Sequence, residues 1–223
     1  MSKLRFEISI SADGYVAGPD QSEEHPLGEG GEQLHEWVVK LDTWRRSHGH
    51  SGGEANASSA IIEEAMENVG AVIMGRNMFG GGPGPWDPEW RGWWGEEPPF
   101  HMPTFVLTHH QREPLEMAGG TTFHFVTDGI EPALVRAREA AGGKDVRLGG
   151  GAEAAQQYLA AGLVDELQLN IVPILLGAGE RLFENVGADL ELEQACVVHT
   201  PEVTHVRYRV GAGSGATGSN QSP

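Results

Sequence analysis

Residues 146–173 have the sequence VRLGGGAEAAQQYLAAGLVDELQLNIVP, which predicts a strand, a helix and a second strand. The short apolar run at 146–148 predicts the first strand. Residues 152–161 are rich in alanine and are followed by Gly162, a common residue just after a helix. Residues 167–173 predict the second strand. A strand that is joined through a helix to another strand is typical of a parallel sheet.

The same alternation extends along most of the chain. Short apolar runs between turn signals predict four further strands, at 4–10, 71–74, 104–107 and 121–126. Near the C-terminus, residues 190–198 and 203–210 predict an antiparallel pair that turns at Thr200-Pro201.

Three further helices are predicted between these strands. Apolar residues at helical spacing predict an amphipathic helix at 32–48. A second helix at about 58–70 can be capped by Ser58 or Ser59, and a third is predicted at 132–141. We therefore expect an α/β fold with a mostly parallel central sheet, helices on both faces and an antiparallel C-terminal edge.

The length of the chain, 223 residues, suits one sizeable core, although it would also permit two small domains. No linker interrupts the middle of the sequence, so we expect a single domain over residues 1–210. Residues 211–223 are rich in Gly and Ser and predict a disordered tail.

The charge of the chain limits its partners. Lys and Arg number 15 against 32 Asp and Glu, a formal net charge of −17. Such a field repels nucleic acid and anionic membranes, so we expect neither as a partner. An anionic cofactor needs a local cluster of backbone N–H groups and cations.

The N-terminus and the cysteine count indicate the compartment. The first residues lead directly into a strand, with no apolar run long enough for a signal peptide or a membrane span. Cys196 is the only cysteine, which excludes an internal disulfide and a multi-cysteine zinc site. We therefore expect a cytoplasmic protein.

Three loops follow predicted strands and should meet, because ligands bind outside the carboxyl ends of parallel strands. Each loop offers backbone N–H groups, cations or hydroxyls that suit phosphate groups. Glycine after a strand is also ordinary turn chemistry, so each loop alone is a weak signal. The loops contain Gly75, Arg76 and Asn77; Thr108, His109, His110 and Arg112; and Gly149, Gly150, Gly151 and Ala152.

The third loop satisfies the dinucleotide fingerprint as Gly149-x-Gly151-x-x-Ala154, but it occurs late in the chain. The following acidic residues, Asp165 and Glu166, stand at the start of the next strand and cannot reach a ribose at its carboxyl end. The pattern therefore argues against a Rossmann domain.

Several motifs together resemble a known family. They are ISADGYVAG at 10–18, MGRN at 74–77, VLT at 106–108, GGG at 149–151, GLVDEL at 162–167 and PILLGAG at 173–179. Their order and spacing resemble the dihydrofolate reductase-like fold from about residue 3 to residue 210. Within that fold they are most similar to the branch that includes the reductase domain of bacterial riboflavin biosynthesis.

The resemblance implies NADPH as cofactor and a homodimer as assembly. It places Gly75, Arg76 and Asn77 near the phosphates and residues 108–110 near the adenosine 2′-phosphate. The three glycines and Ala152 would surround the pyrophosphate. Arg76 and Arg112 are cations in an acidic chain and also favour NADPH over NADH.

One departure bears on catalysis. Folate reductases carry a carboxylate on their first helix, and this chain has no clear counterpart, because Glu36 lies opposite the apolar face while His35 and Asp42 share its flank. Asp13 is the predicted catalytic residue, as a proton relay or a substrate hydrogen bond. The alternative is that Asp13-Gly14 only makes a tight turn.

The substrate site and the tryptophans leave two more alternatives open. We expect the substrate to contact Tyr15, Trp37, Pro173 and Gly177, although Trp37 also belongs to an apolar stripe typical of a core position. Asp87-Pro88 predicts the start of a helix that would align Trp86, Trp90, Trp93 and Trp94 on one face. That face could cover a flat substrate or pack on the protein body or a second subunit.

Other chemistries have less support. The pairs His48 and His50 and His109 and His110 lack a nearby carboxylate at a recognised ligand spacing, so we expect no metal. The sequence therefore predicts an NADPH-dependent oxidoreductase that transfers a hydride to a small cyclic, pterin-like or pyrimidine-like substrate. The alternatives are a catalytically silent nucleotide-binding regulatory protein and a purely structural oligomerisation module on the same fold.

Overall fold

A computed structural model describes residues 2–188 and 190–212. The predicted tail therefore lies almost entirely outside the described residues. Within them, the strands are β1 (Leu4–Ser11), β2 (Tyr15–Ala17), β3 (Val69–Gly75), β4 (Pro103–Leu107), β5 (Leu115–Glu116), β6 (Thr122–Val126), β7 (Asp145–Leu148), β8 (Glu166–Val172), β9 (Glu180–Arg181), β10 (Leu190–His199) and β11 (Thr204–Ala212). The helices are η1 (Gly31–His35), α1 (Glu36–Val39), α2 (Asp42–Ser47), α3 (Ala57–Met66), α4 (Arg76–Phe79), η2 (Ala118–Gly120), α5 (Ile130–Ala140) and α6 (Ala152–Ala160).

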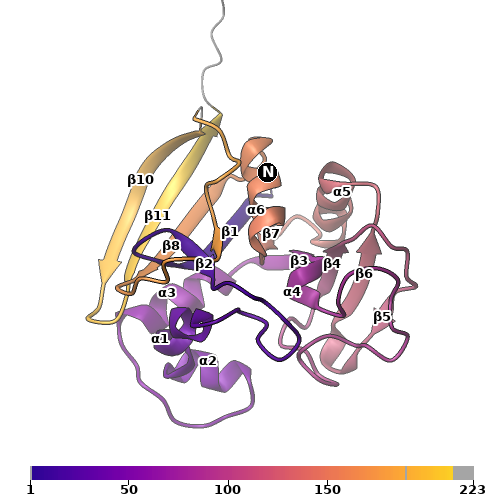
Figure 1. Ribbon diagram of the computed structural model, residues 1–223, viewed down its shortest axis with the longest axis horizontal. Helices are drawn as coiled ribbons and strands as arrows, with labels where there is room; N and C mark the ends of the chain where they lie inside the picture. Colours follow the sequence, from indigo (N-terminus) through magenta and orange to yellow (C-terminus); the bar gives the residue numbers. More distant parts are fainter. Residues whose placement is uncertain (1, 189, 213–223) are drawn as a thin grey trace, which may run out of the picture.

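The main sheet has the strand order β10-β11-β8-β1-β7-β3-β4-β6-β5 (Figure 1). Its central strands, from β8 to β6, are all parallel to their neighbours. β11 and β10 form an antiparallel edge beside β8, and β5 is antiparallel at the other edge. This arrangement confirms the predicted fold class, including the antiparallel C-terminal edge.

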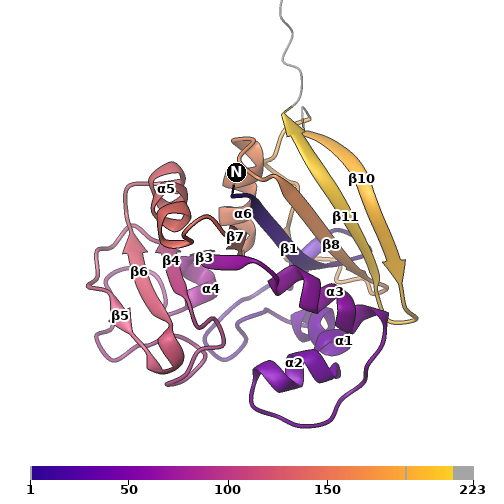
Figure 2. The ribbon, with the colours of Figure 1, turned by 180° about the vertical axis from the view of Figure 1, so that it is seen from behind.

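Helices cover both faces of the sheet (Figure 2). Leu4 and Phe6 of β1 pack with Leu134 of α5 and Tyr158 of α6 in the largest apolar cluster. On the opposite face, Trp37 of α1 donates a hydrogen bond to Ser9 of β1 at 3.2 Å. Because side chains alternate along β1, one strand is buried against both helix layers.

The predicted helix at 32–48 is wrong as a single element, because the chain is divided into η1, α1 and α2. Leu41 has extended backbone angles between the two α-helices. The N–H of Asp42 donates to the carbonyl of Glu54 at 3.0 Å, and the N–H of Glu54 donates to the carbonyl of Lys40 at 2.9 Å. These bonds replace the helical ones, while the apolar stripe remains buried through Leu34, Trp37 and Leu41.

The start and end of α3 also differ from the prediction. Asn56, and not Ser58 or Ser59, caps the helix, because its side chain accepts a hydrogen bond from the N–H of Ser58 at 2.8 Å. Ser59 completes the cap by accepting from the N–H of Asn56 at 3.3 Å. The helix ends at Met66, four residues before the predicted end.

The tryptophan-rich segment, residues 80–102, contains no helix, so the helix predicted after Asp87-Pro88 is wrong. Gly80, Gly81, Gly82 and Gly84 have left-handed φ angles and lead the chain through irregular turns. The aromatic residues still gather on the protein body. Trp86, Trp90 and Trp94 pack on the cluster that contains Phe79 and Phe123. Packing on the body, one of the two predicted roles, is therefore confirmed for these three.

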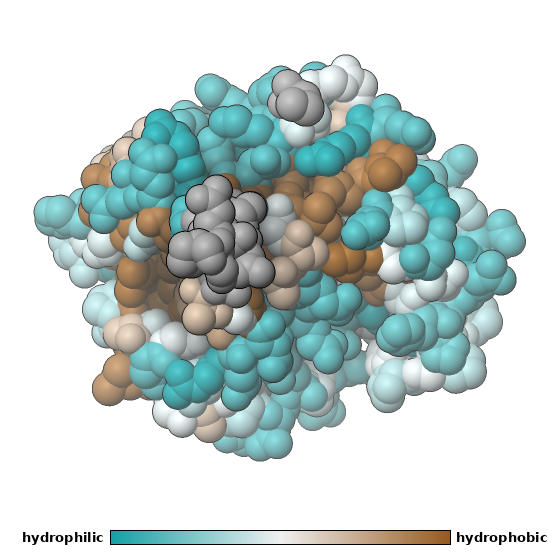
Figure 3. All heavy atoms as spheres, turned by 90° about the horizontal axis from the view of Figure 1, so that it is seen from above, coloured by the Kyte–Doolittle hydropathy of each residue, from teal (hydrophilic) through white to brown (hydrophobic). Residues whose placement is uncertain are grey.

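The described residues lack membrane-spanning helices and clusters of metal-ligating side chains. Over 2–188 and 190–212, the helices are too short or too polar to cross a bilayer. The same residues hold no group of three or more His, Cys, Asp or Glu side chains that could bind a metal ion. Hydrophilic residues cover most of the face seen in Figure 3.

Candidate functional site

The first and third predicted loops are in direct contact at the carboxyl ends of β3 and β7. The N–H of Gly75 donates to the carbonyl of Gly150 at 2.7 Å, and the N–H of Gly149 donates to the carbonyl of Ile73 at 2.8 Å. A Cβ on Gly75 would lie 3.2 Å from the Cβ of Ala154. Glycine therefore permits this close approach of the two loops.

The triple-glycine loop leads into the N-terminus of α6. Gly151 is the N-cap, and it makes no side-chain cap hydrogen bond. The N–H groups of the first helical turn consequently have no partner within the helix and carry the positive end of the helix dipole. A Cβ added to Gly151 would meet no atom within 4 Å, so this loop faces open space.

The second loop is fixed beside the first by the parallel pairing of β3 and β4. The N–H of Thr108 donates to the carbonyl of Val126 at 3.0 Å, and the Thr108 hydroxyl accepts from the N–H of His110 at 3.2 Å. In this second loop Thr108 is buried and His109 is exposed, and Asn77 of the first loop is also exposed. The structure therefore brings all three predicted loops to one edge of the sheet.

Arg76 and Arg112 meet at the ring of Trp86. The Cζ atom of Arg76 lies 3.7 Å from the centroid of that ring, and the Cζ atom of Arg112 lies 5.3 Å from it. The Trp86 indole N–H donates to the carbonyl of His110 at 2.8 Å. Trp86 thus connects the loop after β3 with the loop after β4, a role that its spacing in the sequence did not indicate.

Neither guanidinium has a carboxylate partner within the described residues. The Nε and Nη1 atoms of Arg76 and the Nη1 atom of Arg112 are buried without an acceptor there. Burial lowers the pKa of both groups, and the nearby Arg91 lowers that of Arg112 further. Buried donors without acceptors are destabilising, so this cluster is suited to an anion from outside the chain.

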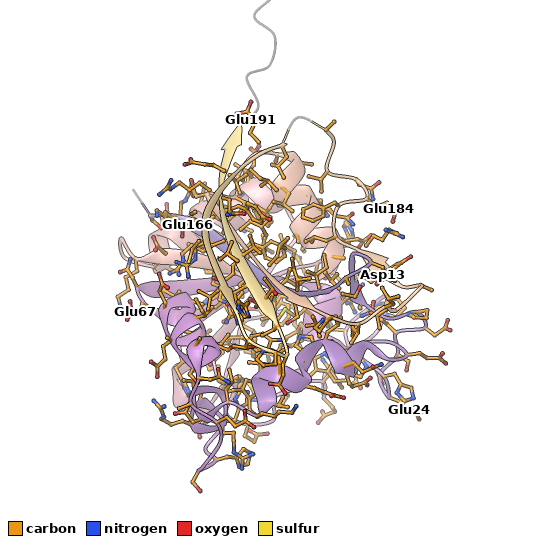
Figure 4. The ribbon with its side chains drawn as sticks, turned by 90° about the vertical axis from the view of Figure 1, so that its left-hand side faces the viewer. Asp13, Glu24, Glu67, Glu166, Glu184 and Glu191 are labelled. Carbon is orange, nitrogen blue, oxygen red and sulfur yellow. The ribbon has the colours of Figure 1, made fainter. Side chains whose placement is uncertain are left out.

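Asp13 lies at the opposite end of β1 from Glu67 and Glu166 (Figure 4). Its Oδ1 accepts from the Ser11 hydroxyl at 2.6 Å and from the N–H of Leu176 at 3.2 Å, and its Oδ2 accepts from the N–H of Gly177 at 2.8 Å. The Ser11 bond and then the backbone bonds lower the pKa of Asp13 to about 2. The ionised carboxylate therefore holds the loop after β8 against the end of β1.

Two other predicted substrate residues lie in the same corner. The Tyr15 hydroxyl accepts from Arg181 Nη2 at 2.9 Å and donates to the carbonyl of Gly177 at 3.3 Å. Tyr15 is buried, whereas Gly177 is exposed. Sequence analysis missed Arg181, because the two-residue strand β9 that contains it is too short to give a recognisable pattern.

The two remaining predicted substrate residues, Trp37 and Pro173, differ in how far they are buried. Trp37 is only 3% exposed and packs against the ring of His205, which agrees with the alternative core role. Pro173 is exposed just after β8. Asp42, which flanks the predicted first helix, accepts hydrogen bonds from Ser59 and Arg46. It is therefore engaged in holding α2 and α3 together.

Comparison with known proteins decides the family. Residues 2–206 match the family described as the RibD C-terminal domain. The chain belongs to the RibD C-terminal domain family. Membership confirms the predicted relationship and the predicted class, an oxidoreductase. Among curated protein sequences, none matched the chain.

Solved structures support the same fold at low sequence identity. A protein ascribed to riboflavin biosynthesis from Shewanella sp. PV-4 is 23% identical, with a TM-score of 0.59 over 95% of this chain and 99% of that one. The riboflavin biosynthesis reductase Rib7 of Saccharomyces cerevisiae is 10% identical, with a TM-score of 0.53 over 94% and 89%. Dihydrofolate reductase from Enterococcus faecalis, complexed with NADP(H), is 13% identical, with a TM-score of 0.50 over 93% and 96%.

Proposed function

We propose that this RibD C-terminal domain protein is an NADPH-dependent reductase that transfers a hydride to a small cyclic, pyrimidine-like or pterin-like substrate. The observation that carries the proposal is the pair of half-buried arginines, Arg76 and Arg112. The Nε and Nη1 atoms of Arg76 and the Nη1 atom of Arg112 have no acceptor among the described residues. The NADP(H) complex of the Enterococcus faecalis enzyme, which shares the fold, supports the choice of cofactor.

The residues at the sheet edge fit the two phosphate regions of NADPH. The pyrophosphate would be held by Gly149 to Gly151 and by the free N–H groups at the start of α6, with Gly75 and Asn77 beside them. Backbone N–H groups suit this group, because it needs close approach more than additional charge.

The 2′-phosphate of NADPH would be held by Arg76 and Arg112, with Thr108, His109 and His110 beside it. Ala152, at the start of α6, would complete the pyrophosphate site. A phosphate monoester carries close to two negative charges at neutral pH, and each guanidinium offers charge-assisted hydrogen bonds. NADH lacks this group and would leave both cations without an anionic partner. The proposal therefore includes a preference for NADPH.

The bound cofactor supplies the hydride, and the chain supplies position. We assign the substrate to the corner where β1 and β8 end, beside Tyr15, Trp37, Pro173 and Gly177. Asp13 is proposed to act there by fixing the loop that contains Gly177, because its carboxylate already accepts three hydrogen bonds. With a pKa of about 2 it is a hydrogen-bond acceptor and not a proton donor at neutral pH.

We also propose that residues 1–210 act as one domain, and that the protein is a homodimer located in the cytoplasm. Sedimentation of the purified protein tests the assembly directly, with a mass near 23.9 kDa contradicting the dimer.

The first test is titration of the protein with NADPH and, separately, with NADH, followed by quenching of tryptophan fluorescence. Trp86 lies beside the proposed phosphate site, so its fluorescence should respond to binding. We expect NADPH to bind at least about tenfold more tightly than NADH, as loss of one or two charge-assisted hydrogen bonds implies. Absence of binding by either dinucleotide would contradict the proposal.

A second candidate is a nucleotide-binding regulatory protein without turnover. It is favoured by the engagement of Asp13 and Asp42, the two aspartates that the sequence analysis considered for catalysis, in structural hydrogen bonds. A panel of oxidised pyrimidines and pterins, assayed by the loss of reduced nicotinamide absorbance, separates the two. NADPH binding without turnover on any member would favour the regulatory protein.

A further inference from the structure

We propose that Trp86 is a positioning residue that presets Arg76 and Arg112 for a dianionic phosphate monoester and thereby sets the preference for NADPH over NADH. This inference rests on the proposed function, because it assigns the 2′-phosphate to the two arginines.

The indole of Trp86 contacts both arginines. Its ring lies under both guanidiniums, at 3.7 Å for Arg76 and 5.3 Å for Arg112. Apart from that contact, Arg76 has one long hydrogen bond, from Nη2 to the carbonyl of Gly81 at 3.5 Å. The indole is therefore the main group that fixes the direction of the Arg76 guanidinium.

Trp86 also affects the electrostatic interaction between the two arginines. Arg76 and Arg112 carry like charges, and the charge of Arg76 contributes to the lowered pKa of Arg112 after burial and Arg91. No described carboxylate pairs with either guanidinium, although the chain has 32 acidic residues. The negative face of the indole partly offsets the repulsion. The Nε and Nη1 atoms of Arg76 and the Nη1 atom of Arg112 remain without an acceptor among the described residues. The Nη2 atom of Arg112 already donates to the carbonyls of Pro88 at 3.2 Å and Trp90 at 2.6 Å.

The indole itself is held in place by contacts on several sides. Its N–H donates to the carbonyl of His110 at 2.8 Å, and its ring makes edge contacts with Phe79 at 5.6 Å and Phe125 at 5.0 Å between centroids. Trp86 is consequently held from α4, from β6 and from the loop after β4. An arginine on a fixed surface loses less conformational entropy when it binds a phosphate than a free one does.

The test compares three variants of the full chain. Trp86→Leu removes the aromatic face, and Trp86→Phe keeps an aromatic face but removes the hydrogen bond to His110. Trp94→Phe is the matched control, because Trp94 belongs to the same segment and packs on Phe100 and Phe123 without a guanidinium. Dissociation constants for NADPH, NADH, adenosine 2′,5′-bisphosphate and adenosine 5′-monophosphate are measured by calorimetry for each protein.

We expect Trp86→Leu to weaken the binding of NADPH and of adenosine 2′,5′-bisphosphate about tenfold, as the loss of a desolvated cation–π contact implies. The dissociation constants of NADH and of adenosine 5′-monophosphate should change less than about twofold. Trp86→Phe should give a smaller loss with the same selectivity, and Trp94→Phe should keep the wild-type ratio. Circular dichroism and thermal melting show which variants fold. If Trp86→Leu does not fold, the ratio in Trp86→Phe decides.

The outcomes separate the inference from the function on which it rests. If the wild-type protein prefers NADPH and the folded Trp86 variants keep that preference, the inference is overturned and the proposed function stands. If the wild-type protein binds neither dinucleotide, the proposed function fails first. Equal weakening of NADPH and NADH by Trp86→Leu would show a purely structural role and would also overturn the inference.

Discussion

Two of the arginines that lie over aromatic rings near the carboxyl ends of the strands, Arg76 and Arg181, differ in what surrounds them. Arg181 lies over Tyr15 at 4.4 Å, is exposed, and donates to the Tyr15 hydroxyl at 2.9 Å and to the carbonyl of Asp13 at 3.3 Å. Arg76 lies over Trp86 at 3.7 Å, and its Nε and Nη1 atoms are buried without an acceptor in the described chain. Arg181 therefore uses its donors in hydrogen bonds within the protein, whereas Arg76 keeps donors without an acceptor.

This difference shows that proximity of a cation to an aromatic ring does not by itself indicate a binding site. The informative quantity is the set of donors that remain without acceptors after the protein's own groups are counted. By that measure, the Tyr15 corner is complete and the Trp86 corner is incomplete. Binding of the cofactor phosphates should therefore depend on the second corner, and stability should depend more on the first.

The largest effect is expected from changing the arginines of the two corners. The double variant Arg76→Gln, Arg112→Gln should raise the dissociation constant for NADPH about 100-fold, because charge-assisted hydrogen bonds contribute about 1.5–3 kcal/mol each and are not fully additive. Arg181→Gln should change the same constant less than about threefold. Calorimetric titration measures both. Equal losses in the two proteins would break the comparison.

A smaller effect is expected from Tyr15→Phe. The change removes the hydroxyl that links Arg181 to the carbonyl of Gly177, and it should lower the free energy of unfolding by about 1 kcal/mol. The ratio of the NADPH and NADH dissociation constants should stay at the wild-type value. Urea unfolding and dinucleotide titration are the measurements, and a changed ratio with unchanged stability would contradict the assignment of this corner.

The smallest effect concerns acid stability at Asp13. The folded pKa of about 2 lies below the ordinary value of 3.8, so the folded state binds the Asp13 proton less readily than the unfolded state. The resulting stabilisation is complete above about pH 3.8 and is lost as pH falls through about 2. Urea unfolding of the wild type and of Asp13→Asn should therefore converge over this window. A constant difference between them down to the lower pH would show that Asp13 contributes without its charge.

The sequence predicted the longer strands because their apolar runs are nearly continuous, as in β3 and β4, which are buried from both sides. It missed the strands β2, β5 and β9, because two or three residues are too short to show a pattern. The helix at 32–48 could not be divided correctly, since the break at Leu41 depends on backbone bonds to Glu54 across an irregular loop. The tryptophan-rich segment had helical spacing without a helix, because it begins with four left-handed glycines and its aromatic residues pack on Phe79.

The candidate site shows the same division. The three loops were predictable, because a parallel sheet brings the carboxyl ends of its strands to one edge. The link through Trp86 was not predictable, since it joins residues 76 and 112 through a side chain in an irregular segment. The role of Asp13 also required the structure, because its partners Leu176 and Gly177 lie more than 160 positions away.

The crystal structure of the protein with NADPH tests the central claim most directly. We expect the 2′-phosphate to accept hydrogen bonds from Arg76 and Arg112 beside Trp86, with the pyrophosphate against Gly149 to Gly151. A 2′-phosphate bound at Arg181 and Tyr15, or one exposed to solvent away from both arginines, would contradict the claim.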